Sequence, residues 1–469
     1  MVTSLRKLVE SARVTPACSG KLPQPAFARY EILFFSLSVL TFVISLAASE
    51  ALLMAAALCY AIEQLCAPRL GRPARPGLRF PFPPVRLPVG LFCLFTVLSV
   101  FGAADPAAGW PAVRKLVLFL IMLLAVALAG ARAFQELLYA GLFFASVVAG
   151  AVGVFQFAVE YQAVEAAHPG QTYMYMSISR IHGFMGHWMN FGGQQMLVFC
   201  ALLAYLLFSE AKGSQPSRPD GSARTGVAPA DTKPLGWGKA AWLLVAVIAL
   251  SIALNFTRGV WLGCFVAVVY LVARRKPPWL LALPLLIALG YLAGPSLMRE
   301  RLDSLLHPTR DPSISIRLEM WQVALRMIRA HPWLGVGPNN IEREYALYLP
   351  PGKSPEVGYH EHFHDNLLQL GAERGLGCMA SWVWMMAGIF WGLVKLRRQS
   401  SASQRAPAWV VEAAIAGWLA FATEGFFEFN FGTSPVLMLF LFMVSVPFAR
   451  GRLAEPAARD LHEASRGRR

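Results

Sequence analysis

Residues 113–130 read VRKLVLFLIMLLAVALAG, two cations followed by an unbroken apolar run, and residues 137–158 (LLYAGLFFASVVAGAVGVFQFA) form a second run without a charge. Such runs approach the ~20 apolar residues with which an α-helix crosses a bilayer. Of the 469 residues, 56% are hydrophobic and 15% are charged, whereas soluble domains average about 45–50% and about 25%. The composition therefore excludes a soluble globular enzyme and a disordered chain, and it predicts an all-α polytopic membrane protein.

Twelve apolar runs predict about twelve transmembrane helices. They lie at residues 32–48, 50–66, 88–103, 113–130, 137–158, 192–209, 240–256, 259–273, 279–293, 376–394, 409–427 and 434–449. If both chain ends are cytoplasmic, the inner segments hold 29 Lys and Arg, the short outer loops hold 4, and one long outer loop holds 9. Lys and Arg concentrate in cytoplasmic loops, so this distribution predicts that the long loop faces the periplasm.

The runs divide the chain into segments. We expect a cytoplasmic N-terminal segment (1–31), transmembrane helices 1–9 (32–293), a large periplasmic loop domain (294–375), transmembrane helices 10–12 (376–449) and a basic cytoplasmic tail (450–469). Residues 210–238, rich in Gly, Ser, Pro and Ala, predict a flexible cytoplasmic linker.

The large loop carries a helical apolar seam. Its members, spaced 4, 3, 4 and 3 residues apart, are Ile314, Leu318, Trp321, Leu325 and Ile328. This spacing places them on one face of a helix. The seam predicts a folded loop that lays this face on the membrane surface or on other helices.

Eight of the nine histidines fall on the predicted outer side, and three of them form the His-x-His-x-His run at 360–364. An extended segment would turn these three side chains the same way and let them bind a transition metal. The helical pattern that follows favours another interpretation, in which His364 lies near a helix start and acts as a general base. Glu424 and Glu428, four residues apart, can bind a metal, accept sugar hydroxyls, cap a helix or pair with cations. No DxD or ExD pair and no P-loop occur, so we expect no metal and no cofactor, and no ATP-driven transport.

Three arginines stand at the predicted outer membrane edge: Arg180, Arg258 and Arg317. Each one alone can extend its charged end to lipid headgroups. Arg258 lies between two apolar spans with almost no loop, and a guanidinium at that depth needs a partner. Together the three form a plausible clamp for phosphate oxygens, which guanidinium groups match in geometry and charge.

Three stretches resemble the bacterial O-antigen ligases and the related O-antigen polymerases. They are Arg180–Asn190 (RIHGFMGHWMN), Thr257-Arg258-Gly259, and Ser315–Gly377 with its S-x-R-x-x-x-W, H-P-x-x-G-x-G and H-x-H-x-N patterns. The family signature H-[NSQ]-x9-G-x-x-G falls on His364, Asp365, Gly375 and Cys378. Asp365 and Cys378 depart from it, in place of the amide residue and the last glycine.

The resemblance implies a fold like that of the C-type membrane glycosyltransferases and an O-antigen ligase at the periplasmic face of the bacterial inner membrane. The donor would be a glycan on undecaprenyl pyrophosphate, the acceptor a lipid A–core sugar, and transfer would proceed without metal and with inversion. We assign the acceptor base to His364 and the stabilisation of the pyrophosphate leaving group to Arg180, Arg258 and Arg317. His362 and Asn190 are expected to bind substrate.

Two alternatives remain open. An O-antigen polymerase or a protein O-oligosaccharyltransferase would use the same residues with another acceptor. A lipid-glycan flippase or transporter would place ionisable groups near the bilayer midplane, whereas here they cluster at one predicted face. A nucleic-acid partner is not expected, because most Lys and Arg residues lie in the segments predicted to be cytoplasmic, as membrane topology alone requires.

Overall fold

The computed structural model describes residues 26–66, 82–209, 240–293, 296–306, 312–353, 361–399 and 406–449. Throughout these ranges the regular elements are helices, as predicted for an all-α protein. Residues 1–25 of the N-terminal segment, the linker 210–238, the tail 450–469 and His360 lie outside the described residues.

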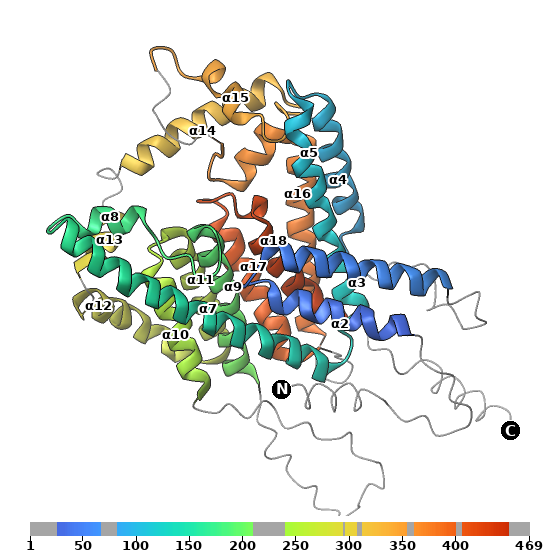
Figure 1. Ribbon diagram of the computed structural model, residues 1–469, viewed down its shortest axis with the longest axis horizontal. Coiled ribbons are helices and arrows are strands. Elements are labelled where there is room, and N and C mark those ends of the chain that lie inside the picture. The colour runs from blue at the N-terminus through green and yellow to red at the C-terminus, as the bar shows by residue number, and fades with distance from the viewer. Residues whose placement is uncertain are drawn as a thin grey trace, which may run out of the picture.

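Each of the twelve apolar runs overlaps a helix (Figure 1). The predicted boundary between the first two runs is wrong, because α2 ends at Thr41 and α3 begins at Leu46, so the turn between them falls inside the run 32–48. The helices are α2 (Ala26–Thr41), α3 (Leu46–Cys66), α4 (Arg86–Phe101), α5 (Pro106–Lys115) continued by η2 (Leu116–Phe119) and α6 (Leu120–Leu128), α7 (Arg132–Ala167), α9 (Trp188–Phe208), α10 (Ala240–Leu254), α11 (Arg258–Arg275), η3 (Pro277–Ala282) with α12 (Leu283–Ala293), α16 (Asn366–Arg398), α17 (Ala408–Glu424), and α18 (Ser434–Ser445) with η7 (Val446–Phe448).

Five of these segments are long and apolar enough to cross a membrane unaided: α3, the continuous stretch Pro106–Leu128, α7, α9 and α16. Three shorter apolar helices span Arg86–Phe101, Ala241–Leu254 and Ser434–Phe448. The chain is thus a helical protein with membrane-spanning character, and the count of twelve crossings stays a prediction.

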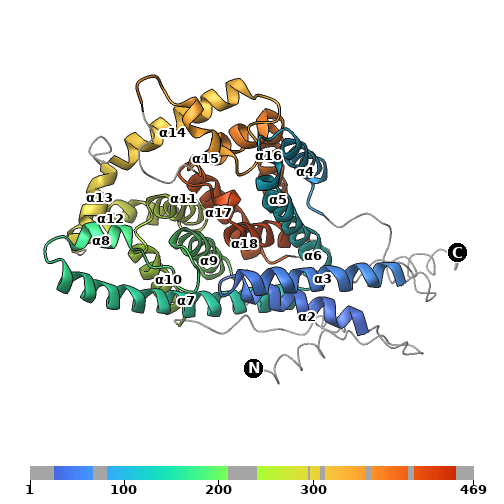
Figure 2. The ribbon, with the colours of Figure 1, turned by 45° about the horizontal axis from the view of Figure 1, so that its top comes forward.

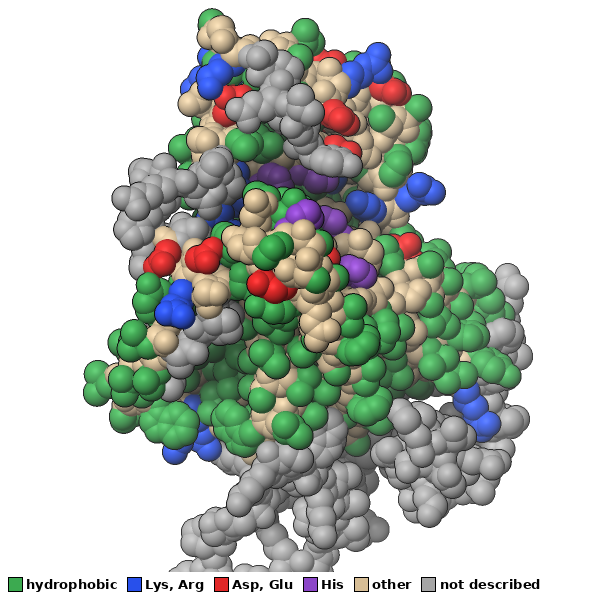
Figure 3. Space-filling model, turned by 60° about the vertical axis from the view of Figure 1, so that its left-hand side comes forward, with side chains coloured by type: hydrophobic (Ala, Val, Ile, Leu, Met, Phe, Trp, Pro, Cys, Tyr) green, Lys and Arg blue, Asp and Glu red, His purple; other side chains and the backbone are tan. Residues whose placement is uncertain are grey.

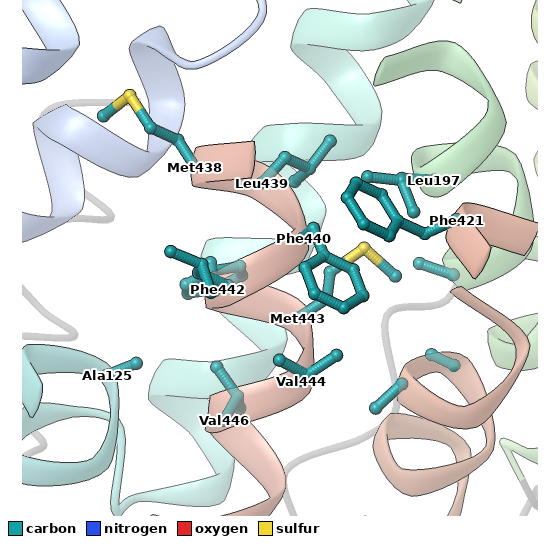
Figure 4. Packing of buried hydrophobic residues seen from close by; sticks show 14 of the residues in the cluster. Ala125, Leu197, Phe421, Met438, Leu439, Phe440, Phe442, Met443, Val444 and Val446 are labelled. Atoms are coloured by element: carbon teal, nitrogen blue, oxygen red, sulfur yellow. The ribbon is translucent and has the colours of Figure 1, made fainter. Parts of the chain in front are cut away.

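The core of the bundle is built around α18, whose twelve residues are all buried. A helix that is apolar on every side is stable only when other helices surround it. Here α6, α9 and α17 pack against it, and the rings of Phe421 and Phe440 stack with centroids 4.0 Å apart. Figure 4 shows side chains on opposite sides of α18, with Phe440 facing Phe421 and Phe442 pointing the other way. Between helices in a membrane, association is driven by close van der Waals packing rather than by exclusion of water, so the ring contacts on α18 hold the surrounding helices together.

The large loop folds into helices with a core of its own. It contains α13 (Ser296–Leu306), α14 (Pro312–Ala330), α15 (Ile341–Glu344) and η5 (Tyr345–Tyr348), and Figure 2 shows α14 and α15 along one edge of the molecule. The core side chains are Met320, Val323, Ala324, Met327, Val336, Ile341, Tyr345, Phe363 and Ala372.

The predicted helix of the large loop is therefore present, but its buried face is displaced from the predicted seam. Met320, Val323 and Met327 are buried, whereas Leu318 and Leu325 are 52% and 44% exposed. The prediction that the seam packs on other helices is thus wrong at Leu318 and Leu325. The neighbouring face of α14, which carries Met320, Val323 and Met327, is the one that packs into the core of the loop. Contact of that seam with the membrane surface stays a prediction.

The H-P-x-x-G-x-G stretch fastens the large loop to α16 at a break in that helix. Gly375 has φ +80° inside α16, and a Cβ there would lie 2.1 Å from the carbonyl oxygen of Trp333. Across the break, the amide of Leu376 donates to the carbonyl of Pro332 at 2.8 Å, and the amide of Val336 donates to that of Ala372 at 2.9 Å. Only glycine avoids both the backbone strain and the clash, so the break fixes where the loop ends and the predicted span 376–394 begins.

Candidate active site

His364 lies directly before the start of α16, as predicted. It has φ +51°, and the next residue, Asp365, caps the helix, since its side chain accepts a hydrogen bond from the amide of Leu368 at 2.8 Å. Aspartate is among the best N-cap residues, which accounts for its presence where the family pattern has an amide. The second departure, Cys378, is fully buried and lies 3.8 Å from the hydroxyl of Thr96 on α4.

The imidazole of His364 is held by a buried carboxylate. Its Nδ1 lies 2.8 Å from Oε2 of Glu428, and the other carboxylate oxygen accepts a hydrogen bond from Nη2 of Arg317 at 2.9 Å. The side chain of Glu428 is 4% exposed, whereas those of His364 and Arg317 are 28% and 27% exposed. Burial acts to raise the pKa of Glu428, but the hydrogen bond and charge of His364, with those of Arg317, hold the pKa below its usual value.

This arrangement sets the chemistry of the ring. A carboxylate only accepts hydrogen bonds, so Nδ1 carries the proton in this pair. In the neutral imidazole the lone pair is then on Nε2, which makes no hydrogen bond to any residue within the described ranges. The pair is therefore oriented to receive a proton at Nε2, as a general base does.

Arg180 and Arg258 are positioned by a buried asparagine. Asn255, at the end of α10, is fully buried, and its Nδ2 donates to the carbonyls of Ile181 and Trp188 at 3.0 and 3.1 Å. These bonds attach the turn before Arg258 to the segment that joins α8 (Thr172–Ile178) to α9. Arg258 is the first residue of α11, whose N-terminus adds a partial positive charge.

Arg180 is in the electric field of three other guanidinium groups. Its Cζ lies 4.0 Å from the centre of the Trp188 ring, and its Nε donates to the carbonyl of Ser177 at 2.7 Å. Burial, followed by the positive charge of Arg301, lowers the pKa of Arg180 to about 10; Arg258 and Arg317 act in the same direction and Glu428 opposes them. The guanidinium group of Arg317 contacts Glu428, and the charges of Arg258, Arg301 and Arg317 all act on Arg180; a concentration of positive charge of this kind favours a bound anion.

The structure describes the surroundings of His362 and Asn190, the two further residues predicted to bind substrate. The ring of His362 lies 5.4 Å from that of Phe429, and its pKa is lowered chiefly by burial. Asn190 lies in the first turn of α9, and among the described residues its side chain has no hydrogen-bond partner. Their predicted contacts with substrate stay predictions.

The two glutamates at the end of α17 have different partners. Oε2 of Glu424 accepts from Nδ2 of Asn430 at 3.0 Å, whereas Glu428 holds His364 and Arg317. The sequence left four roles open for these glutamates: metal binding, contact with sugar hydroxyls, helix capping and ion pairing. The structure shows Glu428 in an ion pair with Arg317. No cluster of three or more His, Cys, Asp or Glu side chains suited to a metal ion occurs among the described residues.

Three residues of the site were not assigned from the sequence: Glu428 as partner of His364, Asn255 and Arg301. Arg301, on α13, is 8% exposed, and its Nε donates to the carbonyl of Phe256 at 3.0 Å. Phe256 has φ +54°, so Arg301 binds the strained turn that precedes Arg258. Nothing near Arg301 in the sequence indicates that it binds this turn. Asn255 lies two residues before the Thr257-Arg258-Gly259 stretch, so a polar amide beside Arg258 was a signal that the sequence offered.

One face of the molecule gathers histidines. Figure 3 shows histidine side chains both in a recess between the upper part and the apolar lower body and on the surface just below that recess, with Lys and Arg side chains nearby. Of the four predicted groups, His364 and Arg317 both bind Glu428, and Arg180 is affected by the charges of Arg258, Arg317 and Glu428; their joint role at one site stays a prediction.

Comparison with known proteins agrees with the resemblance of the motifs. A search of curated proteins finds no significant match to the chain. Residues 243–383, which include Arg258, Arg317, His362 and His364, match the family model described as O-antigen ligase. The chain therefore carries a domain of the O-antigen ligase and polymerase superfamily.

Proposed function

We propose that this protein is an O-antigen ligase. It transfers a glycan from undecaprenyl pyrophosphate to a sugar of the lipid A–core at the periplasmic face of the bacterial inner membrane. Transfer inverts the anomeric carbon and needs no metal and no cofactor. The proposal rests on the family match over residues 243–383 and on the groups that surround Glu428.

The arginines serve the departing lipid pyrophosphate. As the bond between the sugar C1 and the phosphate oxygen breaks, negative charge grows on that oxygen. Fixed cations placed where charge develops stabilise the transition state without reorganising. Arg180, Arg258 and Arg317 supply these charges, and Arg301 reinforces them through the turn at Phe256.

His364 serves the acceptor. The acceptor hydroxyl gives its proton to Nε2 while its oxygen forms the new bond to C1, and the pyrophosphate leaves with the electron pair of the broken bond. Glu428 keeps the proton of His364 on Nδ1 and stabilises the positive imidazole that results. General-base help of this kind contributes about 10²–10⁴ in rate.

A single observation carries the proposal: His364 Nδ1 is hydrogen-bonded to a buried carboxylate that also pairs with Arg317. The proposed base and one of the proposed cations, Arg317, are thus joined through one side chain. A polymerase or a protein O-oligosaccharyltransferase of the superfamily would share this arrangement, and only the acceptor separates the three activities.

Complementation tests the acceptor. The wild-type chain should restore smooth lipopolysaccharide in a strain that lacks its own ligase, and His364→Ala should not, although it inserts in the membrane to the same level. Purified His364→Ala should still bind the lipid-linked donor. Rough lipopolysaccharide that remains unmodified by the wild type, together with altered glycan chain length or glycosylated pilin, would assign the chain to a sibling activity.

A further inference from the structure

A second polar group lies around Phe429, one residue after Glu428. The His362 ring is 5.4 Å from the Phe429 ring, and Nζ of Lys115 donates to the carbonyl of Gly432 at 2.8 Å. Gly432 in turn packs directly on Phe429, since a Cβ at Gly432 would lie 2.1 Å from that ring. Side chains from α5 and from the segment before α16 therefore meet on the 428–432 segment.

This second group lies away from the arginines. Arg180, Arg258 and Arg301 come from the α8–α9 segment, α11 and α13, whereas Lys115 ends α5. In Figures 1 and 2, α8, α11 and α13 lie on one side of α17, and α5 lies on the other. The 428–432 segment follows the end of α17, and its two ends have different partners: Glu428 binds His364 and Arg317, whereas the carbonyl of Gly432 accepts from Lys115.

The second group retains unused binding capacity. Lys115 is exposed, and its ammonium has three donors, of which one is directed to Gly432. Nδ1 of His362 is buried and has no hydrogen-bond partner among the described residues. The nearby carboxylate of Glu373 has its own partners, because it accepts from the amide of Asn339 at 3.0 Å and pairs with Arg374 at 3.5 Å.

An inverting displacement requires the incoming hydroxyl and the leaving phosphate on opposite sides of C1. With the donor pyrophosphate on the arginines, the acceptor must approach from the other side of His364. Lys115, at Gly432, and His362, at Phe429, are polar groups of the described residues that lie against this segment.

We infer that Lys115 and His362 form an acceptor site for an anionic saccharide. Lys115 binds a phosphate or carboxylate group of the acceptor, and His362 hydrogen-bonds to its hydroxyls, while His364 takes the proton of the reacting hydroxyl. Because this inference rests on the proposed function, its test separates acceptor binding from the transfer reaction itself.

The experiment uses the purified full chain in detergent with the lipid-linked donor at saturation and rough lipopolysaccharide as the varied acceptor. Lys115→Met removes the charge and keeps most of the side-chain length. It should raise the acceptor KM about tenfold, the typical loss for one charge-assisted hydrogen bond, and leave the donor KM within twofold. Arg114→Met, a matched change at the neighbouring exposed cation, should change neither constant by more than twofold.

A second acceptor, rough lipopolysaccharide stripped of its core phosphates, provides a test that does not depend on a variant. The wild type should lose affinity for it to the same extent, and Lys115→Met should show no further loss, because the two changes remove the same contact. His362→Gln should raise the acceptor KM for both forms alike.

The outcomes are distinguishable. If the wild type transfers glycan but Lys115→Met keeps a normal acceptor KM, or raises the donor KM equally, the inference fails while the proposed function stands. If the wild type yields no product with either acceptor, the proposed function fails. Should Lys115→Met not fold, equal wild-type affinity for the intact and the stripped acceptor would overturn the inference by itself.

Discussion

Replacing Glu428 by glutamine removes one negative charge at nearly constant volume, and it tests how His364 becomes a base. The carboxylate is 4% exposed and accepts one hydrogen bond from His364 at 2.8 Å and one from Arg317 at 2.9 Å. The amide of glutamine has one acceptor oxygen and one NH₂ group. The amide oxygen of glutamine can replace only one carboxylate oxygen. Either the N–H of His364 or the N–H of Arg317 must therefore face the NH₂ group, which is itself a donor.

The magnitude follows from that mismatch. A buried donor left without an acceptor costs about 1–3 kcal/mol, so the thermal midpoint should fall measurably in detergent. If the imidazole instead shifts its proton to Nε2, the hydroxyl loses its base and the whole contribution of about 10²–10⁴ in rate. We expect kcat for transfer to fall by at least about 10², with donor affinity changed much less.

The assay is single-turnover transfer of a labelled glycan with both substrates saturating, alongside donor binding measured separately. Glu412→Gln is the matched control. Glu412 is also buried, lies near the other end of α17, and pairs with Arg274 at 3.4 Å. It is twelve residues before Glu424 on the same helix, or about 18 Å away, so its loss should lower stability and leave kcat unchanged.

A Glu428→Gln protein that turns over within threefold of the wild type would refute the reasoning, because His364 would then need no carboxylate to act. Equal losses of kcat in Glu412→Gln and Glu428→Gln would also refute it, since they would reflect stability alone.

Other changes test the rest of the site. Arg258→Ala should lower both donor affinity and kcat, and Arg258→Lys should recover little of either if the guanidinium binds the pyrophosphate through two nitrogens; full recovery by lysine would argue for a simple point charge. Gly375→Ala should lower the free energy of unfolding by about 2 kcal/mol or more, because φ at this position is +80° and the added Cβ would meet the carbonyl of Trp333. An unchanged thermal midpoint would contradict the close contact between the loop and α16 at this glycine. Transfer should proceed fully in EDTA, and inhibition reversed by a divalent ion would point to metal ligands. The lowered pKa of Glu428 means that its stabilisation is complete above the usual carboxylate pKa of about 4.3 and is lost as the pH falls through the lower folded value; unfolding midpoints measured from about pH 6 to 3 should show this slope in the wild type and not in Glu428→Gln.

The helices could be predicted from the sequence because uninterrupted apolar runs leave few other structures. The runs marked only the apolar part of each helix, however. The run at 137–158 lies within α7, which extends to Ala167 through Glu160 and Glu165. Polar residues that continue a helix beyond the apolar part carry no hydropathy signal, so the ends of α2 and α7 were not predictable.

The site was predictable where its residues are signalled locally. His364 precedes a helical pattern, and Arg258 interrupts two apolar runs, so both were expected at functional positions. Glu428 is 64 residues from His364, and nothing near it in the chain indicates that contact. The buried face of α14 was not predicted for a related reason. The helix has two neighbouring apolar faces, and which of them is buried depends on the residues of the loop that pack against it.

The order of synthesis matters for a bundle whose centre, α18, follows in the chain the helices that it supports. Phe35 and Phe42, which are translated early, pack on Phe442 of α18, and Glu428 lies six residues before the first residue of that helix. A nascent chain that already contains the arginines and His364 therefore still lacks both the central helix and the carboxylate that holds the imidazole. Translation must reach α18 before the early helices can take up their final packing, so the bundle and the candidate site are completed together.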